Sequence, residues 1–197
     1  MRLDSKKLVT QKLAEVAYLF GEIRQPLTNY LLIPRVSSET RNYIPIGFID
    51  KDVIVSDAVF AMPNASLYEF GVVTSSMHMA WVKTVCGRLK SDYRYSNTIV
   101  YNNFPFPQNI SDLLKDKIVN CASNILTARK NEEEKAILAN SHPSLSAMYA
   151  SGAMPVELVN AHKANNKAVD EAYGYKGGDD DASRVAFLFK RYEELTS

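Results

Sequence analysis

Four charged side chains, Arg88, Lys90, Asp92 and Arg94, occupy alternate positions in the stretch GRLKSDYRYS. Side chains on an extended strand alternate between two faces, so this spacing predicts one strand with all four charges on one face and the tyrosines on the other. Such a face combines cationic donors with one carboxylate acceptor, which suits it to contact a polar partner. The alternative is a solvated face, because the exposed side of a strand is usually polar.

Basic residues are interleaved with aromatic and small polar ones in two segments, IPRVSSETRNYIP (residues 33–45) and VKTVCGRLKSDYRYSN (residues 82–97). Lysine, arginine and short hydroxyl side chains are among the groups that bond DNA phosphates and sugars. On this pattern the candidate contacts to a DNA backbone or groove are Arg35, Ser37, Ser38, Arg41, Lys83, Arg88 and Arg94. An ordinary solvated surface again stays open as the alternative.

The motifs that carry catalysis are mostly missing from the sequence. It has no glycine-rich phosphate loop, no metal-binding triad and no serine nucleophile elbow. NNFPFP (residues 102–107) partly resembles the Asn-Pro-Pro-aromatic motif of amino-group DNA methyltransferases, but Phe104 stands at the first proline position and no glycine-rich turn precedes it. We therefore predict no catalytic residue, and interpret this segment as a rigid, aromatic-anchored exit from a sheet.

The cysteines and histidines give no sign of a disulfide or a metal site. Cys86 and Cys121 lie in helix-like apolar patterns without a CxxC spacing, which predicts reduced core thiols. The three histidines, His78, His142 and His162, are scattered without ligand spacing and are predicted to be structural or surface residues. No metal is expected to bind this chain.

The composition is that of an ordinary globular protein. With 197 residues, 46% hydrophobic content and a net charge of +1, the chain can bury a substantial core but offers no overall charge to attract nucleic acid or membrane. Its longest apolar runs are far shorter than a membrane span, and no signal-peptide apolar core follows MRLDSKK. These features predict a cytoplasmic protein with no membrane partner.

Hydrophobic periodicity predicts a mixed first half. Residues 5–20 carry apolar side chains at helical spacing after a possible N-cap at Asp4 or Ser5. The runs that predict an antiparallel sheet are residues 29–34, 43–49 and 52–62. One helix or a pair is predicted over residues 66–89, with a break near residues 74–76.

The pattern changes around residue 107. Residues 93–107 are of β type and end in an extended, proline-containing segment, whereas everything from residue 109 onward predicts helices, with an N-cap in the turn YKGGDDDA. The first part carries twelve basic against nine acidic residues, and the second carries eleven against thirteen. The predicted fold class is α+β: a mixed domain with short antiparallel strands over residues 1–107, followed by an all-helical C-terminal subdomain over residues 108–197.

Several long motifs of the chain resemble one known family. They are YLFGEIRQP, YLLIPRVSSE, YIPIGF, SSMHMAWVKTVCGRLKSDYRYS and IVYNNFPFP, in that order, followed by AHKANNKAVDEAYGY and ASRVAFLFKRYEEL. They resemble the C-terminal target-recognition region of MmeI-like (type IIL or IIG) restriction-modification enzymes, which are class I adenine-specific DNA methyltransferases. The resemblance covers essentially the whole chain.

The resemblance implies a DNA-reading fragment of a larger enzyme. In that family a metal-dependent nuclease, a helical connector and an adenine-N6 methyltransferase domain precede this region, and none of their motifs occurs here. We therefore expect no catalysis and no cofactor in this fragment, with S-adenosylmethionine, and Mg²⁺ if a nuclease is present, bound by the parent polypeptide. The implied partners are double-stranded DNA and the methyltransferase domain of the same polypeptide, in a bacterial cytoplasm.

The resemblance also singles out Lys90 and Asp92. In the family the two variable positions of the GRLxSxYRYS pattern vary with the base pair read at one end of the recognition site. Lysine donates to O6 and N7 of guanine, whereas a carboxylate accepts from N4 of cytosine. Two same-face residues on a strand are roughly 6–7 Å apart, enough for both edges of one pair. We therefore hypothesise that Lys90 and Asp92 read a G·C pair.

The neighbours of this pair have their own expected roles. Arg88 and Arg94 would flank it on the same face and contact phosphates, while Tyr93 and Tyr95 pack behind the strand. Trp81 either packs under the sheet or stacks on a base. Two other functions stay open for the chain: a structural brace or protein-interaction module for the methyltransferase core, and an autonomous enzyme. Sequence-selective, salt-dependent DNA binding would distinguish base reading from a brace.

Overall fold

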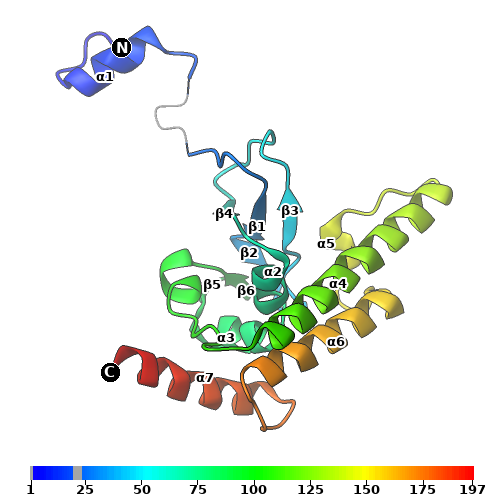
Figure 1. Cartoon of the computed structure of the whole chain (residues 1–197). Helices are drawn as coiled ribbons and strands as arrows, with labels where there is room; N and C mark the ends of the chain where they lie inside the picture. The colour runs from blue at the N-terminus through cyan, green and yellow to red at the C-terminus, as the bar shows by residue number, and fades with distance from the viewer. Residues whose placement is uncertain (1, 20–23) are drawn as a thin grey trace.

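The structure, a computed structural model, describes residues 2–19 and 24–197 (Figure 1). Its first sheet has the strand order β3-β1-β4, with β1 at Tyr30–Pro34, β3 at Gly47–Ile49 and β4 at Val59–Pro63, all antiparallel. The predicted antiparallel sheet is thus confirmed. Two of its strands are shorter than expected, because Pro45 cannot donate a ladder hydrogen bond and the chain between β3 and β4 turns at residues 51–52 and 57–58.

Helices α2 (Leu67–Val73) and α3 (Ser76–Val85) follow, and the predicted break between them is confirmed. A capping box closes the start of α2, where Ser66 and Glu69 bond each other's backbone amides. At the break the Ser75 hydroxyl accepts a hydrogen bond from the His78 amide and so begins α3. The break is therefore encoded locally by the residue types between the two helices.

The second sheet has the order β2-β6-β5, with β2 at Val36–Ser37, β5 at Gly87–Leu89 and β6 at Asp92–Arg94. After it the prediction of β structure fails, since residues Asn97–Tyr101 form a π-helical turn, η1. The Ser96 hydroxyl accepts from the Ile99 amide, and the Asn102 amide donates to the Asn97 carbonyl at 2.8 Å. This side-chain cap favours the turn over an extended strand.

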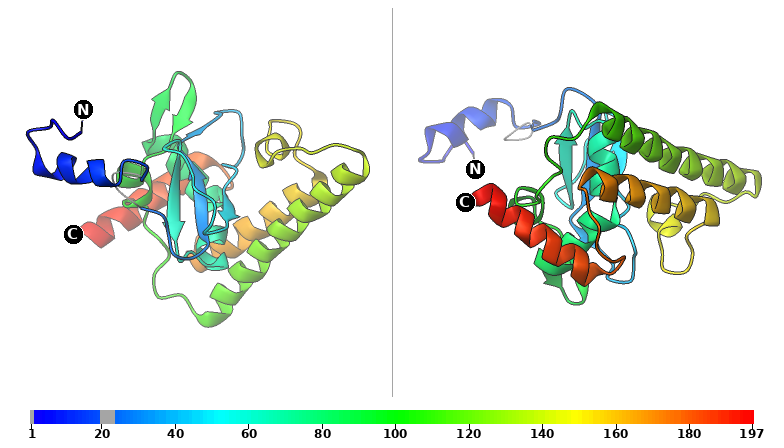
Figure 2. Two further views of the ribbon diagram at one scale, coloured as in Figure 1. Left: turned by 90° about the horizontal axis from the view of Figure 1, so that it is seen from above. Right: turned by 60° about the horizontal axis from the view of Figure 1, so that its bottom comes forward.

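The second half consists of helices, as predicted: α4 (Asp112–Leu138), α5 (Leu145–Met148), α6 (Val156–Ala172) and α7 (Asp181–Thr196). Helices α4 and α6 lie side by side, and α7 packs on α3 (Figures 1 and 2). Asp180 caps α7, which confirms the predicted N-cap. Among the described residues no helix is long and apolar enough to span a membrane.

One core runs through both halves of this α+β fold. Ile118 and Ile125 of α4 and Leu158 of α6 are fully buried in the same cluster as Phe70 of α2. Gly71 of α2 lies so close to α4 that a β-carbon there would stand 2.5 Å from Ile118 Cγ2. The helical part is therefore packed on the mixed part rather than tethered to it.

A buried arginine adds a polar tie between the two parts. Arg129 of α4 donates from Nη1 to the carbonyl of Ile46 at 2.7 Å, and from Nε and Nη2 to the hydroxyl of Tyr149 at 2.9 and 2.6 Å. The Tyr149 hydroxyl lies 2.6 Å from His162 Nε2 on α6. The loop before β3, α4 and α6 are thereby joined through one network.

The N-terminal helix differs from its prediction. Helix α1 spans only Leu8–Glu15, and Lys7 stands at its N-cap position without a side-chain hydrogen bond, so neither Asp4 nor Ser5 caps it. None of its residues is buried, and it stands apart from the rest of the molecule (Figure 1). The predicted apolar contact at Phe20 lies outside the described residues.

Two buried histidines make stability depend on pH. Burial lowers the pKa of His78 to about 4, and burial and then the charge of Arg129 lower that of His162 to about 3. Because unfolding returns each pKa to about 6.5, the unfolded chain takes up two protons as the pH falls below that value. We expect each histidine to cost about 2 kcal/mol of unfolding free energy at pH 5, relative to pH 7.

Urea denaturation at half-unit steps between pH 7.5 and 4.5 measures this slope. Each carboxylate with a lowered pKa adds to the loss only nearer pH 4, so a slope already present between pH 6.5 and 5 reports the histidines. A flat free energy over that interval would contradict the buried, neutral state.

Candidate nucleic-acid interface

The charged row of residues 87–94 forms a hairpin, so the prediction of one continuous strand is wrong. Strands β5 and β6 pair antiparallel with Gly87 opposite Arg94, Arg88 opposite Tyr93 and Leu89 opposite Asp92. Directly opposed residues share a face. Asp92 and Arg94 therefore lie on one face of the hairpin and Arg88 lies on the other, instead of all four charges sharing one face.

Lys90 and Ser91 form the two-residue turn at the tip of this hairpin. Lys90 has a left-handed backbone with φ of 57°, which a two-residue hairpin turn requires at its first position. Glycine or asparagine usually stands there, and a lysine costs on the order of 1 kcal/mol. Lys90 is exposed, and its ammonium has no hydrogen bond or ion pair within the described part of the chain.

Asp92 is held in place by the loop after β2. The Glu39 amide donates to Asp92 Oδ1 at 3.3 Å, and the Tyr93 hydroxyl donates to the Glu39 carbonyl at 3.3 Å. Strand β2 also pairs with β6, Val36 opposite Arg94 and Ser37 opposite Tyr93. The hairpin tip thus carries a free ammonium beside a carboxylate with a fixed orientation.

Arg88 stabilises the hairpin through contacts within the molecule. Its guanidinium lies 4.2 Å from the centre of the Tyr93 ring and donates to the carbonyls of Ser91 at 2.9 Å and Lys83 at 3.3 Å. Glu39 lies 4.0 Å from it. Arg94, on the opposite face, is exposed and has no such partner among residues 2–19 and 24–197. Of the two predicted phosphate contacts, only Arg94 presents an unengaged guanidinium.

Three other predicted contacts are engaged inside the molecule. Lys83 Nζ pairs with Asp181 of α7 at 2.7 Å, and Arg41 Nη2 donates to the Ser146 hydroxyl at 2.6 Å. Ser37 is only 3% exposed. Arg35 is exposed, with its guanidinium 4.6 Å from the centre of the Phe60 ring, and the Ser38 hydroxyl lies 3.0 Å from that of Thr40.

The aromatic residues behind the hairpin are buried. Burial was expected for Tyr93 and Tyr95, and for Trp81 it favours a packing role over stacking on a base. Tyr93 and Tyr95 are 5% and 3% exposed, and Trp81 is 2% exposed with its indole N–H donating to the Val100 carbonyl at 3.0 Å. The Trp81 ring packs against Phe104 and, from α7, Phe189 and Tyr192, and has no free face on which a base can stack. The histidines are placed as predicted for structural or surface residues, since His78 and His162 are buried and His142 is exposed. His78 Nε2 lies 3.1 Å from the Tyr95 hydroxyl.

Glu39 is the residue that the sequence reasoning missed. It touches the hairpin three times, through its amide, its carbonyl and its carboxylate. The signal available was its place at the end of the motif YLLIPRVSSE. Its contacts depend on a pairing of β2 with β6 over more than fifty residues, which no local pattern predicts.

A mixed-charge hollow lies elsewhere, where α3, α6 and α7 meet. It is a cavity of about 420 Å³ whose lining includes Lys83, Asp170, Asp181 and Arg184. These charges pair with one another, Arg184 with Asp170 at 2.9 Å and Lys83 with Asp181 at 2.7 Å. In the described part of the chain no three His, Cys, Asp or Glu residues are grouped to hold a metal ion.

Comparison with known proteins identifies the family. Residues 1–108 match the family described as MmeI, target recognition domain, and residues 110–197 match MmeI, C-terminal domain. The chain belongs to the MmeI target recognition domain family. A solved structure of the type IIL restriction-modification enzyme MmeI in complex with DNA matches 99% of the chain with a TM-score of 0.86 and 42% identity.

A curated relative of this MmeI-type chain is DNA methyltransferase A of Bacillus subtilis (strain 168), which is 37% identical over 193 residues. The alignment covers 95% of this chain and 20% of the relative, and the chain covers 25% of the solved MmeI chain. The chain therefore spans between a fifth and a quarter of the proteins that it matches.

Replacing Lys90 by glycine should separate the effect of this position on stability from its effect on DNA recognition. We expect Lys90→Gly to leave the Tm unchanged or to raise the unfolding free energy by up to about 1 kcal/mol, because glycine adopts positive φ without steric cost. Lys90→Ala keeps the strain and removes the same ammonium. Thermal unfolding of both variants checks this, and a lower Tm for Lys90→Gly than for Lys90→Ala would contradict the strained turn.

Proposed function

We propose that this chain reads a short double-stranded DNA site on behalf of an adenine-N6 methyltransferase of the MmeI type. The main support for this proposal is the hairpin tip, where Lys90 has a free ammonium next to an Asp92 carboxylate that is oriented by the Glu39 amide. The MmeI structure that this chain resembles holds DNA, which supports the proposal. The residues that read the G·C pair are Lys90, through guanine O6 and N7, and Asp92, through cytosine N4.

The hairpin geometry suits this reading better than a single strand would. A two-residue hairpin is narrow enough to enter the major groove, which admits a two-stranded β-ribbon. Both readers lie within the four residues of the turn, whose ends are within about 7 Å of each other. Asp92 has one oxygen committed to the Glu39 amide and keeps the other for a base. The pair therefore reaches both edges of one base pair without strand-to-strand rearrangement.

Arg94 and Arg35 are the phosphate contacts that the structure favours, because both are exposed and neither is drawn into an ion pair with another described residue. Ser38 is the remaining groove contact from the β2 loop. Lys83, Arg41, Ser37 and Arg88 instead hold the reading surface together through their internal contacts.

Replacing Arg94 by glutamine should weaken DNA binding equally for all sequences. Loss of one phosphate contact lowers the slope of log K against log salt by about 1. Filter binding of the chain to a 20-base-pair duplex between 50 and 200 mM salt measures the slope. Lys130→Gln on α4 is the matched control and should keep it. An unchanged slope for Arg94→Gln would remove this contact.

Catalysis and its cofactors belong, in this proposal, to the rest of the polypeptide. S-adenosylmethionine sites of the dinucleotide type need a glycine-rich turn after a strand, and the adjacent glycines Gly177 and Gly178 follow helix α6 instead. Among the described residues no three His, Cys, Asp or Glu side chains are grouped to hold a metal ion. The methyltransferase domain would bind S-adenosylmethionine, a nuclease would bind Mg²⁺, and both would act on DNA in the bacterial cytoplasm.

A band shift tests the proposal against the alternatives. Base reading predicts that the chain prefers duplexes with G·C at one position of a randomised pool, with a preference that Lys90→Ala abolishes. A brace for the methyltransferase core predicts no such selection. Binding of S-adenosylmethionine by the chain in calorimetry would favour an autonomous enzyme instead.

A further inference from the structure

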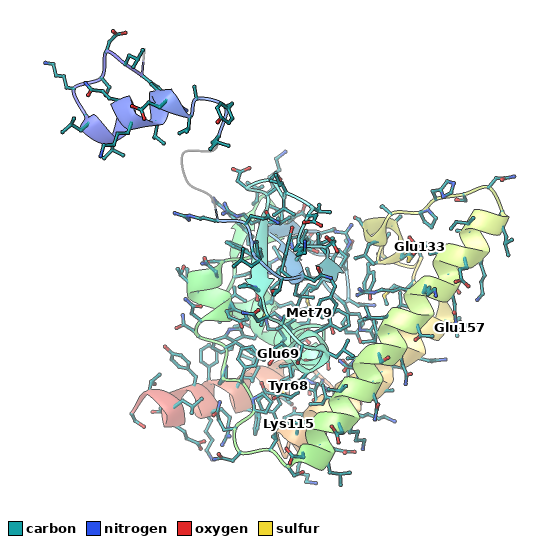
Figure 3. The ribbon with its side chains drawn as sticks, turned by 45° about the horizontal axis from the view of Figure 1, so that its top comes forward. Tyr68, Glu69, Met79, Lys115, Glu133 and Glu157 are labelled. Atoms are coloured by element: carbon teal, nitrogen blue, oxygen red, sulfur yellow. The ribbon has the colours of Figure 1, made fainter. Side chains whose placement is uncertain are left out.

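The N-terminal segment concentrates exposed apolar side chains. Of the 17 large apolar residues that are exposed in the described part of the chain, six precede residue 28: Leu3, Leu8, Val9, Tyr18, Leu19 and Leu27. Leu8 and Val9 are each 73% exposed, and no residue of α1 is buried. Figure 3 shows the side chains of α1 projecting into open space, away from the body of the molecule. The segment has the side chains of a packed helix but no packing partner among the described residues.

Helix α1 is too short to persist by itself. It has eight residues and no side-chain cap, whereas isolated helices shorter than roughly 12–15 residues are marginal in water. Val9 and Leu13 lie four residues apart and so share one face, which Leu8 borders. An apolar face of this kind stabilises a short helix only when another surface covers it.

The comparisons indicate where that surface lies. The second half of the chain matches the C-terminal domain of the MmeI family, and the chain covers 20% and 25% of its two relatives. Most of a polypeptide of this type therefore precedes the region that this chain represents. Among the described elements α1 is the first in the chain, so it is the element nearest in sequence to that preceding part.

We propose that the apolar face of α1 docks on the methyltransferase part that precedes this region in proteins of the family. This inference rests on the proposed function and names a contact between the DNA-reading region and the methyltransferase part of the same polypeptide. A second copy of the chain is a poor occupant, because the basic residues Arg2, Lys6, Lys7 and Lys12 outnumber the acidic Asp4 and Glu15 in residues 2–15, and this net positive charge would repel the same segment of another copy. The docking surface should accordingly be apolar with an acidic border.

The contact would set the distance between the reading hairpin and the methylated base. Gln25 ties the chain after α1 to the loop between β3 and β4, donating to the carbonyls of Lys51 at 2.7 Å and Val53 at 2.9 Å. Tyr30 of β1 donates to the same Val53 carbonyl at 2.6 Å. The chain is therefore fixed to the first sheet at Gln25, ten residues after α1 ends at Glu15.

Amide hydrogen exchange tests the docking. The samples are the 197-residue chain and DNA methyltransferase A of Bacillus subtilis with its matched region replaced by this chain. We expect amides of residues 8–15 to exchange at nearly unstructured rates in the chain alone and about 100-fold more slowly in the joined protein. Leu8→Gln with Val9→Gln should abolish the difference, whereas Leu138→Gln, an equally polar change at an 88% exposed leucine of α4, should preserve it.

Slow exchange of α1 in the chain alone would overturn the docking, and its loss on dilution would indicate self-association. Rapid exchange of α1 in a joined protein that methylates DNA would also overturn it. If the joined protein does not fold, the intact Bacillus subtilis relative replaces it, and rapid exchange of its segment aligned with α1 overturns the docking. The methylated motif separates the two proposals. A protected α1 with no G·C selection contradicts base reading and leaves the docking standing.

Discussion

Replacing Lys90 by glutamate and Asp92 by arginine is expected to exchange G·C for C·G at one position of the methylated site. The swapped pair would present an acceptor where the ammonium stood and bidentate donors where the carboxylate stood, which suits cytosine N4 and guanine O6 and N7 in the opposite order. Each well-made side-chain contact to a base discriminates by about 1–3 kcal/mol. Two exchanged contacts should therefore change the preference by roughly 30- to 25,000-fold.

Modification-sensitive sequencing of DNA from cells that carry the joined methyltransferase measures the exchange directly. The control variant is Lys130→Glu, which reverses an exposed charge on α4 instead of one that supports the hairpin. It should keep G·C. The base-reading hypothesis fails if the double variant methylates the original site, or if the single control moves the preference as far as the double variant does.

Removing the guanidinium of Arg129 should destabilise the protein by about 3 kcal/mol, because the Arg129→Met variant leaves two buried acceptors without their donors. Arg129 is 7% exposed and donates to the Ile46 carbonyl and the Tyr149 hydroxyl, with no carboxylate among its partners in the described part of the chain. Methionine fills much of the same volume, so the loss reports hydrogen bonds rather than a cavity. Urea denaturation measures the change in unfolding free energy.

A double-mutant cycle with Tyr149→Phe assigns the loss. The phenylalanine keeps the ring that packs against His162 and removes the hydroxyl that accepts from Arg129. If the network is real, the double variant should lose less than the sum of the two single variants, by on the order of 1 kcal/mol. Additive losses would contradict it. Arg191→Met on α7, whose partner is the exposed Glu194, should change stability by less than about 1 kcal/mol.

The helices were predictable because their signals are local. The break between α2 and α3 follows from Ser75, which caps one helix directly after the other ends, and Asp180 starts α7 in the same way. Strand β1 and its partners were also predictable in position, although their lengths were not. The π-helical turn η1 was missed because its residues, NTIVY, are of β type, and the cap at Ser96 outweighed that propensity.

The sequence by itself determined the α+β class, the helical second half, the family and the two residues that we propose as base readers. Only the tertiary structure decided how those readers are presented. Charges at every second position are compatible with one long strand and with the two strands of a hairpin. The turn position is occupied by Lys90 instead of a glycine, which would have marked the turn in the sequence. The tertiary structure also decided which basic residues are free, since Lys83 meets Asp181 and Arg41 meets Ser146 across 98 and 105 residues of chain. Contacts over such separations depend on how helices pack on sheets, and the physical reason that sequence patterns miss them is that these patterns extend over only a few turns or one strand.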